Sequence, residues 1–396
     1  MDYMTVTEAA EKWGVSVRQV QRLISAGRIP GAALYGKTYV LPADSTRPGD
    51  PRFAPEPEHP LPSDFAAILA ATTKPAPRDN PDAFIANIKD ERARRQYEAD
   101  MAYIRGGFER TLHCFRQTEG DDAARLRAAS TAIAAAISLG DYHFFQLIES
   151  YLKSLVQKNI SGEITALAEL ALACAYTSAF APNMVAGWLK DGDFSVLSHP
   201  RLRLDAAYKR AKYFQCLKDY ASMLAVAQTA LAFGAADDEM NGSDIYLRVS
   251  CAVASYETGR VNDAKRHLFD AMKICLPHGA ITPFAENVYQ LGGLVDQLLK
   301  REFPAHYDAV MEQMKRTVPN WFSFHNRFTS ENILGILDSR DYQIAARYAR
   351  GDSYRKIAEQ FNISISTVGN TMQKVYEQLL MSGSNRRQQL AKFTYS

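Results

Sequence analysis

Apolar side chains recur every three or four residues along most of this 396-residue chain. From residue 81 to residue 328 the pattern is nearly continuous and rich in Ala, Leu, Tyr and Phe, which predicts consecutive amphipathic helices. Residues 1–42 and 333–396 each carry shorter helical patterns separated by turn residues. The pattern therefore predicts a mostly α protein with a long helical middle and a small module at each end.

Residues 43–80 interrupt the helical pattern. The stretch from Pro42 to Pro81 holds ten of the seventeen prolines in the chain. Proline fixes φ and removes a backbone donor, so the stretch predicts a semi-rigid linker, interrupted by one short helix over residues 64–71. Such a linker would let the first module move relative to the rest.

The helical middle contains a recurring turn. Residues 139–142, 217–220 and 258–261 each follow one predicted helix and precede another, at intervals of 78 and 41 residues. A weaker turn at residues 178–181 divides the longer interval into two steps of about 40, a period typical of helical-hairpin solenoids. Stacked hairpins bury apolar faces that a single hairpin leaves exposed. Residues 81–328 therefore predict an α-solenoid of about five helix pairs.

The clearest single unit of the solenoid is residues 245–275. Small residues stand where its two helices would pack closely and where the chain would turn: Ala252, Ala254, Gly259, Ala264 and Ala271. By these residues the unit resembles a tetratricopeptide-type repeat, although the usual Trp and the closing Pro are absent. The resemblance implies a curved stack of hairpins that receives a ligand or a partner.

The C-terminal segment, residues 333–396, predicts four short helices. They are expected over residues 338–350, 354–361, 365–379 and 385–393, with caps at Asp338, Ser353 and Ser364. Apolar positions on these helices supply a common core: Ile344, Ala345, Tyr348, Ile357, Ala358, Phe361, Ile363, Val368, Val375 and Leu379.

The landmarks of this segment resemble those of LuxR/GerE-type helix-turn-helix domains. They are Leu337, Arg340-Asp341, Gly351, the Ser-x-x-x-Ile-Ala of residues 353–358, Ile363-Ser364, Thr367-Val368, Val375-Tyr376, Leu379 and Asn385-Arg386. The resemblance implies that the helix over residues 365–378 lies in the major groove of DNA, and that the last helix pairs two copies as a homodimer.

The same resemblance implies which side chains contact DNA. Those that would read base edges are Ser366, Thr367, Asn370 and Gln373, since Asn and Gln can bond adenine in two places. Those that would bind phosphates are Arg355, Lys356 and Lys374. The sequence departs from the family at Lys356, Gly369 and Thr371, where Glu, Lys and His are usual. The alternative is a helical cap on the solenoid that does not touch DNA.

The N-terminal segment, residues 1–42, predicts two helices followed by a hairpin. Thr7 is expected to cap a helix that ends at Trp13, and the Ser-x-x-Gln of residues 16–19 is a capping box for the second helix. Two apolar strands around residues 35–37 form the hairpin. Together these elements predict a winged helix-turn-helix.

This segment is similar to MerR/excisionase-type winged helix-turn-helix domains. The similarity lies in Gly14-Val15-Ser16, the stretch Arg18 to Arg22, Gly27-Arg28-Ile29-Pro30 and the Gly-Lys-x-Tyr of residues 36–39. It implies that the residues facing the DNA groove are Ser16, Arg18, Gln19 and Arg22, and that Lys37 and Tyr39 on the wing touch the backbone. Merely solvated arginines, or a protein-interaction module, are the alternatives.

Composition narrows the class of protein. The formal net charge is only +2, so any DNA-binding charge must be local rather than spread over the chain. The absence of an 18-residue apolar run and of a signal-peptide pattern predicts a cytoplasmic protein with no membrane partner. The five cysteines have no CxxC spacing, which predicts reduced core thiols. No metal-ligand, nucleotide-binding or catalytic pattern stands out, so we expect no cofactor, no metal and no enzymatic activity.

These observations predict a sequence-specific DNA-binding transcriptional regulator. Its partners would be double-stranded DNA, a second copy of the chain, and a small-molecule or protein effector bound by the solenoid. The alternative is a solenoid adaptor for protein interactions, whose terminal modules mediate oligomerisation.

Overall fold

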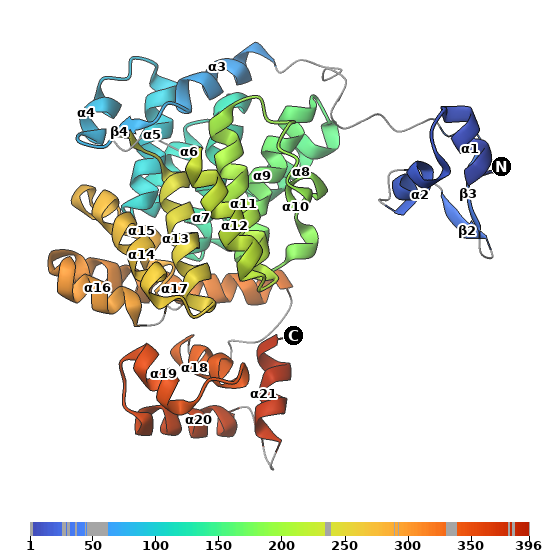
Figure 1. Ribbon diagram of the computed structural model, residues 1–396. Coiled ribbons are helices and arrows are strands. Elements are labelled where there is room, and N and C mark those ends of the chain that lie inside the picture. Colours follow the sequence, from blue (N-terminus) through green and yellow to red (C-terminus); the bar gives the residue numbers. More distant parts are fainter. Residues whose placement is uncertain are drawn as a thin grey trace. The chain divides into compact units, whose positions relative to one another are not determined.

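The computed structural model describes residues 3–25, 29, 32–35, 38–43, 45, 62–233, 239–288, 290–291, 293–329, 339–378, 381 and 385–395. The chain divides into two compact units, residues 1–60 and residues 61–396. We call them the N-terminal unit and the second unit. The predicted mostly α architecture, with many stacked helices, is confirmed (Figure 1).

The N-terminal unit combines two helices with a small antiparallel sheet. Its elements are β1 (Tyr3–Thr5), α1 (Val6–Trp13), α2 (Val17–Ser25), β2 (Ala33–Tyr35) and β3 (Thr38–Pro42), with strand order β1-β3-β2. The predicted hairpin is β2 and β3, whereas the pattern did not predict β1. Seven buried residues form the core: Met4, Val6, Ala9, Ala10, Val20, Ile29 and Leu41.

The first helix begins earlier than expected. Thr5, not Thr7, caps α1: the Thr5 hydroxyl accepts from the Glu8 amide at 3.3 Å, and a Glu8 carboxylate oxygen accepts from the Thr5 amide at 2.6 Å. Thr7 is a poor cap because β1 already ends at Thr5 and leaves no extended residue after it. The reciprocal bonds fix α1 to the edge of the sheet.

The second unit begins inside the stretch expected to be a linker. Helix α3 (Ser63–Thr72) buries Ile68 and Leu69, and β4 (Ala76–Pro77) pairs antiparallel with β5 (Glu239–Met240). The predicted linker over residues 43–80 is therefore too long at its C-terminal end. Proline did not prevent packing here, because Pro75 precedes the two-residue strand β4, Pro77 ends it and Pro62 precedes the helix.

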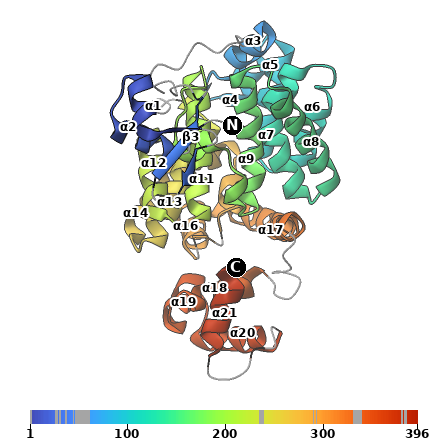
Figure 2. The same cartoon turned by 90° about the vertical axis from the view of Figure 1, so that its right-hand side faces the viewer.

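Stacked helices follow one another through the second unit (Figures 1 and 2). They are α4 (Pro81–Ala86), α5 (Glu91–Ile104), α6 (Phe108–Arg116), α7 (Asp122–Leu139), α8 (Tyr142–Lys158), α9 (Gly162–Ser178), α10 (Gly187–Asp191), α11 (Pro200–Cys216), α12 (Tyr220–Ala232), α13 (Gly242–Glu257), α14 (Val261–Cys275), α15 (Thr282–Ala285), α16 (Leu294–Glu302) and α17 (Tyr307–Thr329). Short 3-10 turns lie at Pro182–Met184, Leu276–His278 and Pro304–His306. The predicted turns at residues 139–142, 217–220 and 258–261 all join consecutive helices.

The hairpin of α13 and α14 shows how the stack is built. Ala252, Ala254, Ala264 and Ala271 are fully buried, so the two backbones approach closely. Gly259 between the helices has φ +78°, a left-handed conformation that favours glycine.

Helix α17 closes the stack against earlier helices through an aromatic cluster. Phe145 of α8 is fully buried, and its ring centroid lies 4.9 Å from that of Phe324 and 6.1 Å from that of Phe328. The cluster joins segments about 180 residues apart in the sequence and fixes α17 to α8.

Replacing Phe145 by alanine should therefore lower the free energy of unfolding by about 3–5 kcal/mol, because the substitution empties the centre of this cluster. Urea unfolding followed by circular dichroism measures the loss. Leu147→Ala, on the same helix with half of its side chain exposed, is the matched control and should change stability by less than about 1 kcal/mol. Equal losses in the two variants would contradict a role of the cluster.

The last four helices form a small bundle, which we call the C-terminal bundle: α18 (Ser339–Ala349), α19 (Tyr354–Phe361), α20 (Ile365–Gln378) and α21 (Arg386–Tyr395). Their bounds differ by only a few residues from those of the predicted helices. Asp338, the expected cap of the first of them, lies outside the described residues. Ser353 caps α19, and the Ser364 hydroxyl accepts from the Thr367 amide at 3.0 Å. The buried core is Ile344, Ala345, Ile357, Ala358, Val368, Met372, Val375, Tyr376 and Leu390.

Candidate nucleic-acid interface

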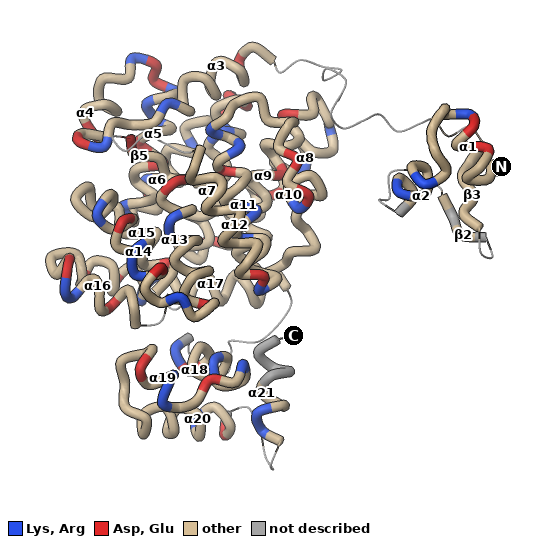
Figure 3. The backbone as a smooth tube through the Cα atoms, in the orientation of Figure 1, with Lys and Arg blue, Asp and Glu red and all other residues tan. Residues whose placement is uncertain are grey.

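Helix α2 of the N-terminal unit presents a polar face. Gly14 turns the chain with φ +65°, and the amide of Gln19 donates to the Ser16 hydroxyl at 3.3 Å at the start of the helix. Val20 is fully buried and fixes the rotation of α2 about its axis. Arg18, Gln19 and Arg22 of α2 are exposed, as is Ser16 just before the helix. Figure 3 draws the basic residues of α2 in blue.

The hairpin of β2 and β3, which corresponds to the predicted wing, follows α2 in the sequence. Leu34 of β2 and Tyr39 of β3 are cross-strand partners, so their side chains lie on one face of the hairpin. They are 58% and 37% exposed, although Leu41 on the same face of β3 is fully buried. The hairpin thus extends beyond the core and offers an apolar edge with one phenol. Lys37 lies outside the described residues.

Comparison with protein families agrees with this arrangement of two helices and a hairpin. Residues 3–45 match a family described as helix-turn-helix domain, a stretch that holds the two helices and the wing strands. No curated protein and no solved structure matches the chain. The N-terminal unit therefore contains a helix-turn-helix domain, a class of fold that binds DNA.

In the C-terminal bundle, three of the predicted base-reading residues share one face. Ser366, Asn370 and Gln373 are spaced three or four residues apart on α20 and are exposed, whereas Val368, Met372 and Val375 face the core. The amide of Gln373 donates to Glu377 at 2.7 Å. Thr367 is half-buried and lies 2.8 Å from the Ser364 hydroxyl, so it belongs to the helix start.

The predicted phosphate-binding cations of the bundle all have partners within it. Lys356 donates to Asp352 at 2.6 Å, and Arg355 lies 3.4 Å from Glu359. Lys374 donates to Asp341 at 2.5 Å, and the Asp341 side chain is only 8% exposed. Of the three, Lys374 has the clearest structural role, because it neutralises a buried carboxylate.

A second ion cluster joins the C-terminal bundle to the stacked helices. Glu257, the last residue of α13, accepts from Arg347 of α18 and from Arg350 just after it, at 3.1 Å in each case. The Arg347 side chain is 7% exposed and its guanidinium lies 5.1 Å from the centre of the Tyr256 ring. Sequence reasoning missed this contact, because nothing in either local pattern indicates that residues 90 apart meet.

Removal of this carboxylate should release the bundle. In Glu257→Ala, Arg347 would remain buried without its main partner, which costs about 3 kcal/mol, or about a hundredfold loss of amide protection in α18. Hydrogen–deuterium exchange read by mass spectrometry measures the protection. Glu359→Ala breaks the exposed pair with Arg355 and should leave α18 protected. Unchanged exchange in Glu257→Ala would show that the contact does not hold the bundle.

Metal sites, membrane spans and thiols are other features that the described part of the chain could carry. Those residues contain no group of three or more His, Cys, Asp or Glu that could hold a metal ion. No described helix has the length and hydropathy needed to cross a membrane. All five cysteines are free thiols on helices, four of them buried and Cys216 partly so.

Proposed function

We propose that this protein is a sequence-specific DNA-binding transcriptional regulator whose N-terminal helix-turn-helix domain reads DNA. The observation that carries the proposal is the exposed polar face of α2 within residues 3–45, the segment that matches a helix-turn-helix family. Arg18 and Arg22 give this face a local positive charge on a chain whose formal net charge is only +2.

The chemistry of the face fits base recognition in the major groove. Arg18 and Arg22 can each donate two hydrogen bonds to guanine, and the Gln19 amide can pair with adenine. Ser16 stands at the start of α2, where hydroxyl and backbone amides bind phosphate. Tyr39, with Lys37 beside it in the sequence, would contact the sugar-phosphate backbone from the wing.

The C-terminal bundle is proposed as a second, LuxR-type DNA reader. Its support is the resemblance of residues 337–386 together with the exposed stripe Ser366, Asn370 and Gln373 on α20. Thr367 would contribute at the helix start, and Arg355, Lys356 and Lys374 would approach phosphates once they exchange their present partners. Helix α21 is proposed as the pairing helix of a homodimer.

The stacked helices are proposed as a tetratricopeptide-like sensor for a small molecule or protein. The support is the α13–α14 hairpin together with the Glu257 cluster, which attaches α18 directly to the stack. In this proposal the chain has no enzymatic activity and needs no cofactor. An effector would act by changing how the bundle is attached.

Arg18 and Arg22 provide the main test. Replacing both by alanine should weaken binding at least about tenfold and relax base preference, since each guanidinium bond to guanine contributes about 1–3 kcal/mol. Fluorescence anisotropy with DNA selected from a random pool by the full chain measures both effects. The control, Arg110→Ala with Arg301→Ala, removes the same charge from exposed sites of the second unit and should bind normally. Equal affinities of the two double variants would refute N-terminal reading.

The role of α20 is tested separately. Asn370→Ala with Gln373→Ala should leave non-specific affinity and its salt dependence intact but lower preference for the selected sequence by about tenfold. Gln297→Ala, an exposed glutamine on α16, is the control. Unaltered preference would favour the second candidate function, a solenoid adaptor with an oligomerising C-terminal bundle. That candidate is favoured by one observation: all three basic residues of α19 and α20 already have acidic partners within the bundle.

A further inference from the structure

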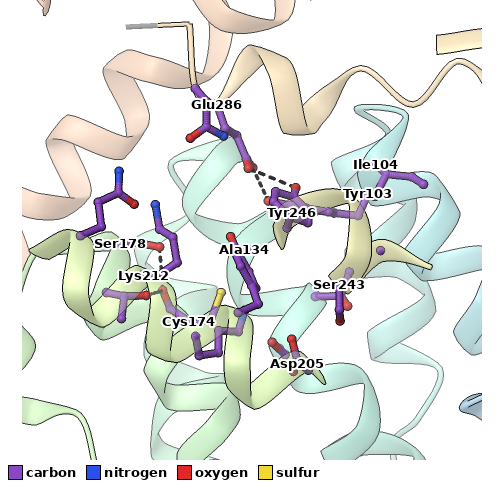
Figure 4. A pocket seen from close by; sticks show the side chains of 18 of the residues that line it. Tyr103, Ile104, Ala134, Cys174, Ser178, Asp205, Lys212, Ser243, Tyr246 and Glu286 are labelled. Carbon is purple, nitrogen blue, oxygen red and sulfur yellow. Dashed lines mark hydrogen bonds between the residues drawn. The ribbon is translucent and has the colours of Figure 1, made fainter. Parts of the chain in front are cut away.

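A cavity of about 690 Å³ lies within the second unit (Figure 4). Its walls come from α5, α7, α9, α11, α13, α17 and α18. The volume falls in the range of sites that enclose drug-sized ligands, about 300–1,000 Å³. The cavity is thus large enough for a small organic molecule.

One wall of the cavity is the polar face of α11. Asp205, Tyr208, Lys209, Lys212 and Gln215 recur every three or four residues and all line the cavity. A helix that only packs against its neighbours carries apolar residues on such a face, because burying a charged group without a partner is costly. Packing alone therefore does not explain this pattern.

Two carboxylates of the cavity, Glu286 and Asp100, already have partners. Glu286, which follows α15, accepts from the hydroxyls of Tyr103 and Tyr246, the latter at 3.1 Å (Figure 4). Asp100 accepts from Thr131 at 2.7 Å and lies 3.4 Å from Arg127. Burial raises the pKa of the Tyr103 and Tyr246 hydroxyls well above the usual value, and the charge of Glu286 adds to the effect, so both remain donors.

Most of the cations are matched as well. Arg201 pairs with Glu239 at 2.7 Å, and Arg347 with Glu257 at 3.1 Å. Lys209 is 6% exposed, and the charge of Asp205, one turn earlier on α11, stabilises its ammonium.

Lys212 differs from these three cations. Within the part of the chain that the structure describes, no hydrogen bond or ion pair holds its ammonium, which projects into the cavity (Figure 4). Burial lowers the pKa of Lys212, and the nearby charge of Glu286 offsets only part of this effect.

Aromatic side chains supply the rest of the site. The rings of Tyr208 and Tyr246 lie 5.0 Å apart at an angle of 31°, and Trp321 and Phe322 of α17 line the cavity too. Such walls favour a flat or apolar ligand body.

We propose that the cavity binds a small aromatic carboxylate, with its carboxylate on the ammonium of Lys212 and its ring among these aromatic side chains. The assignment deepens the proposed sensing function and rests on it. Tyr342, Gln343 and Ala346 of α18 line the same cavity, so the ligand would touch the stack and the C-terminal bundle together. Binding would strengthen the attachment of the bundle.

The test uses two probes of the same shape, 1-naphthaleneacetate and its uncharged amide, titrated into the full chain by calorimetry. Wild-type protein should bind the carboxylate at least about tenfold more tightly than the amide, equivalent to about 1.4 kcal/mol. Lys212→Met should abolish that difference while keeping amide binding, which shows that the cavity is intact. Lys212→Arg should retain the difference, and Lys153→Met, at an exposed site on α8, should behave as wild type.

The proposal is overturned if wild-type protein binds neither probe, shows no preference for the carboxylate, or retains the preference in Lys212→Met. DNA binding, measured for the same proteins without probe, separates the two proposals. Lys212-dependent carboxylate binding without DNA binding would leave the site standing and refute the regulator. DNA binding with no carboxylate preference would leave the regulator standing and refute the carboxylate site.

Discussion

The second unit depends on close contact between helices that cannot bury their apolar faces alone. Alanine makes that contact feasible: Ala252, Ala254, Ala264 and Ala271 are fully buried where α13 meets α14. Small side chains let backbones approach closely, and each hairpin then offers its remaining apolar face to the next. The aromatic cluster around Phe145 performs the same task over a longer distance in sequence, because it joins α8 to α17. Stacking of this kind encloses space, and the cavity is its consequence.

Sequence patterns predicted the local structure well. The turn residues at Gly140 and Gly259, the cap at Ser353 and the period of α20 each depend on neighbours within a few positions, so a pattern can reveal them. Contacts between segments that are far apart in the sequence have no local pattern that predicts them. The pairing of β4 with β5 joins residues 76 and 240, and the Glu257 cluster joins residues 257 and 347. The cap of α1 was misplaced by two residues because the short β1, which ends at Thr5, went unrecognised.

The two helices proposed to bind DNA, α2 and α20, have polar faces of different chemistry. On α2 the face carries Arg18 and Arg22, both exposed. On α20 the exposed stripe is uncharged, and the nearby Lys374 neutralises the buried Asp341. Sequence reasoning assigned Lys374 to phosphate because lysine at that position of a groove-binding helix is expected to face DNA. The three-dimensional arrangement gives it a structural partner that only the folded bundle reveals.

The short segment at the end of α3, residues 72–76, is part of the cavity wall. Thr73 lies 3.0 Å from His199 at the start of α11, and Thr72 to Ala76 line the same cavity as α18. This segment and α18, the helix that begins the C-terminal bundle, therefore line one cavity of the second unit. These two segments are about 270 residues apart in the sequence, so a single occupant of the cavity would contact both.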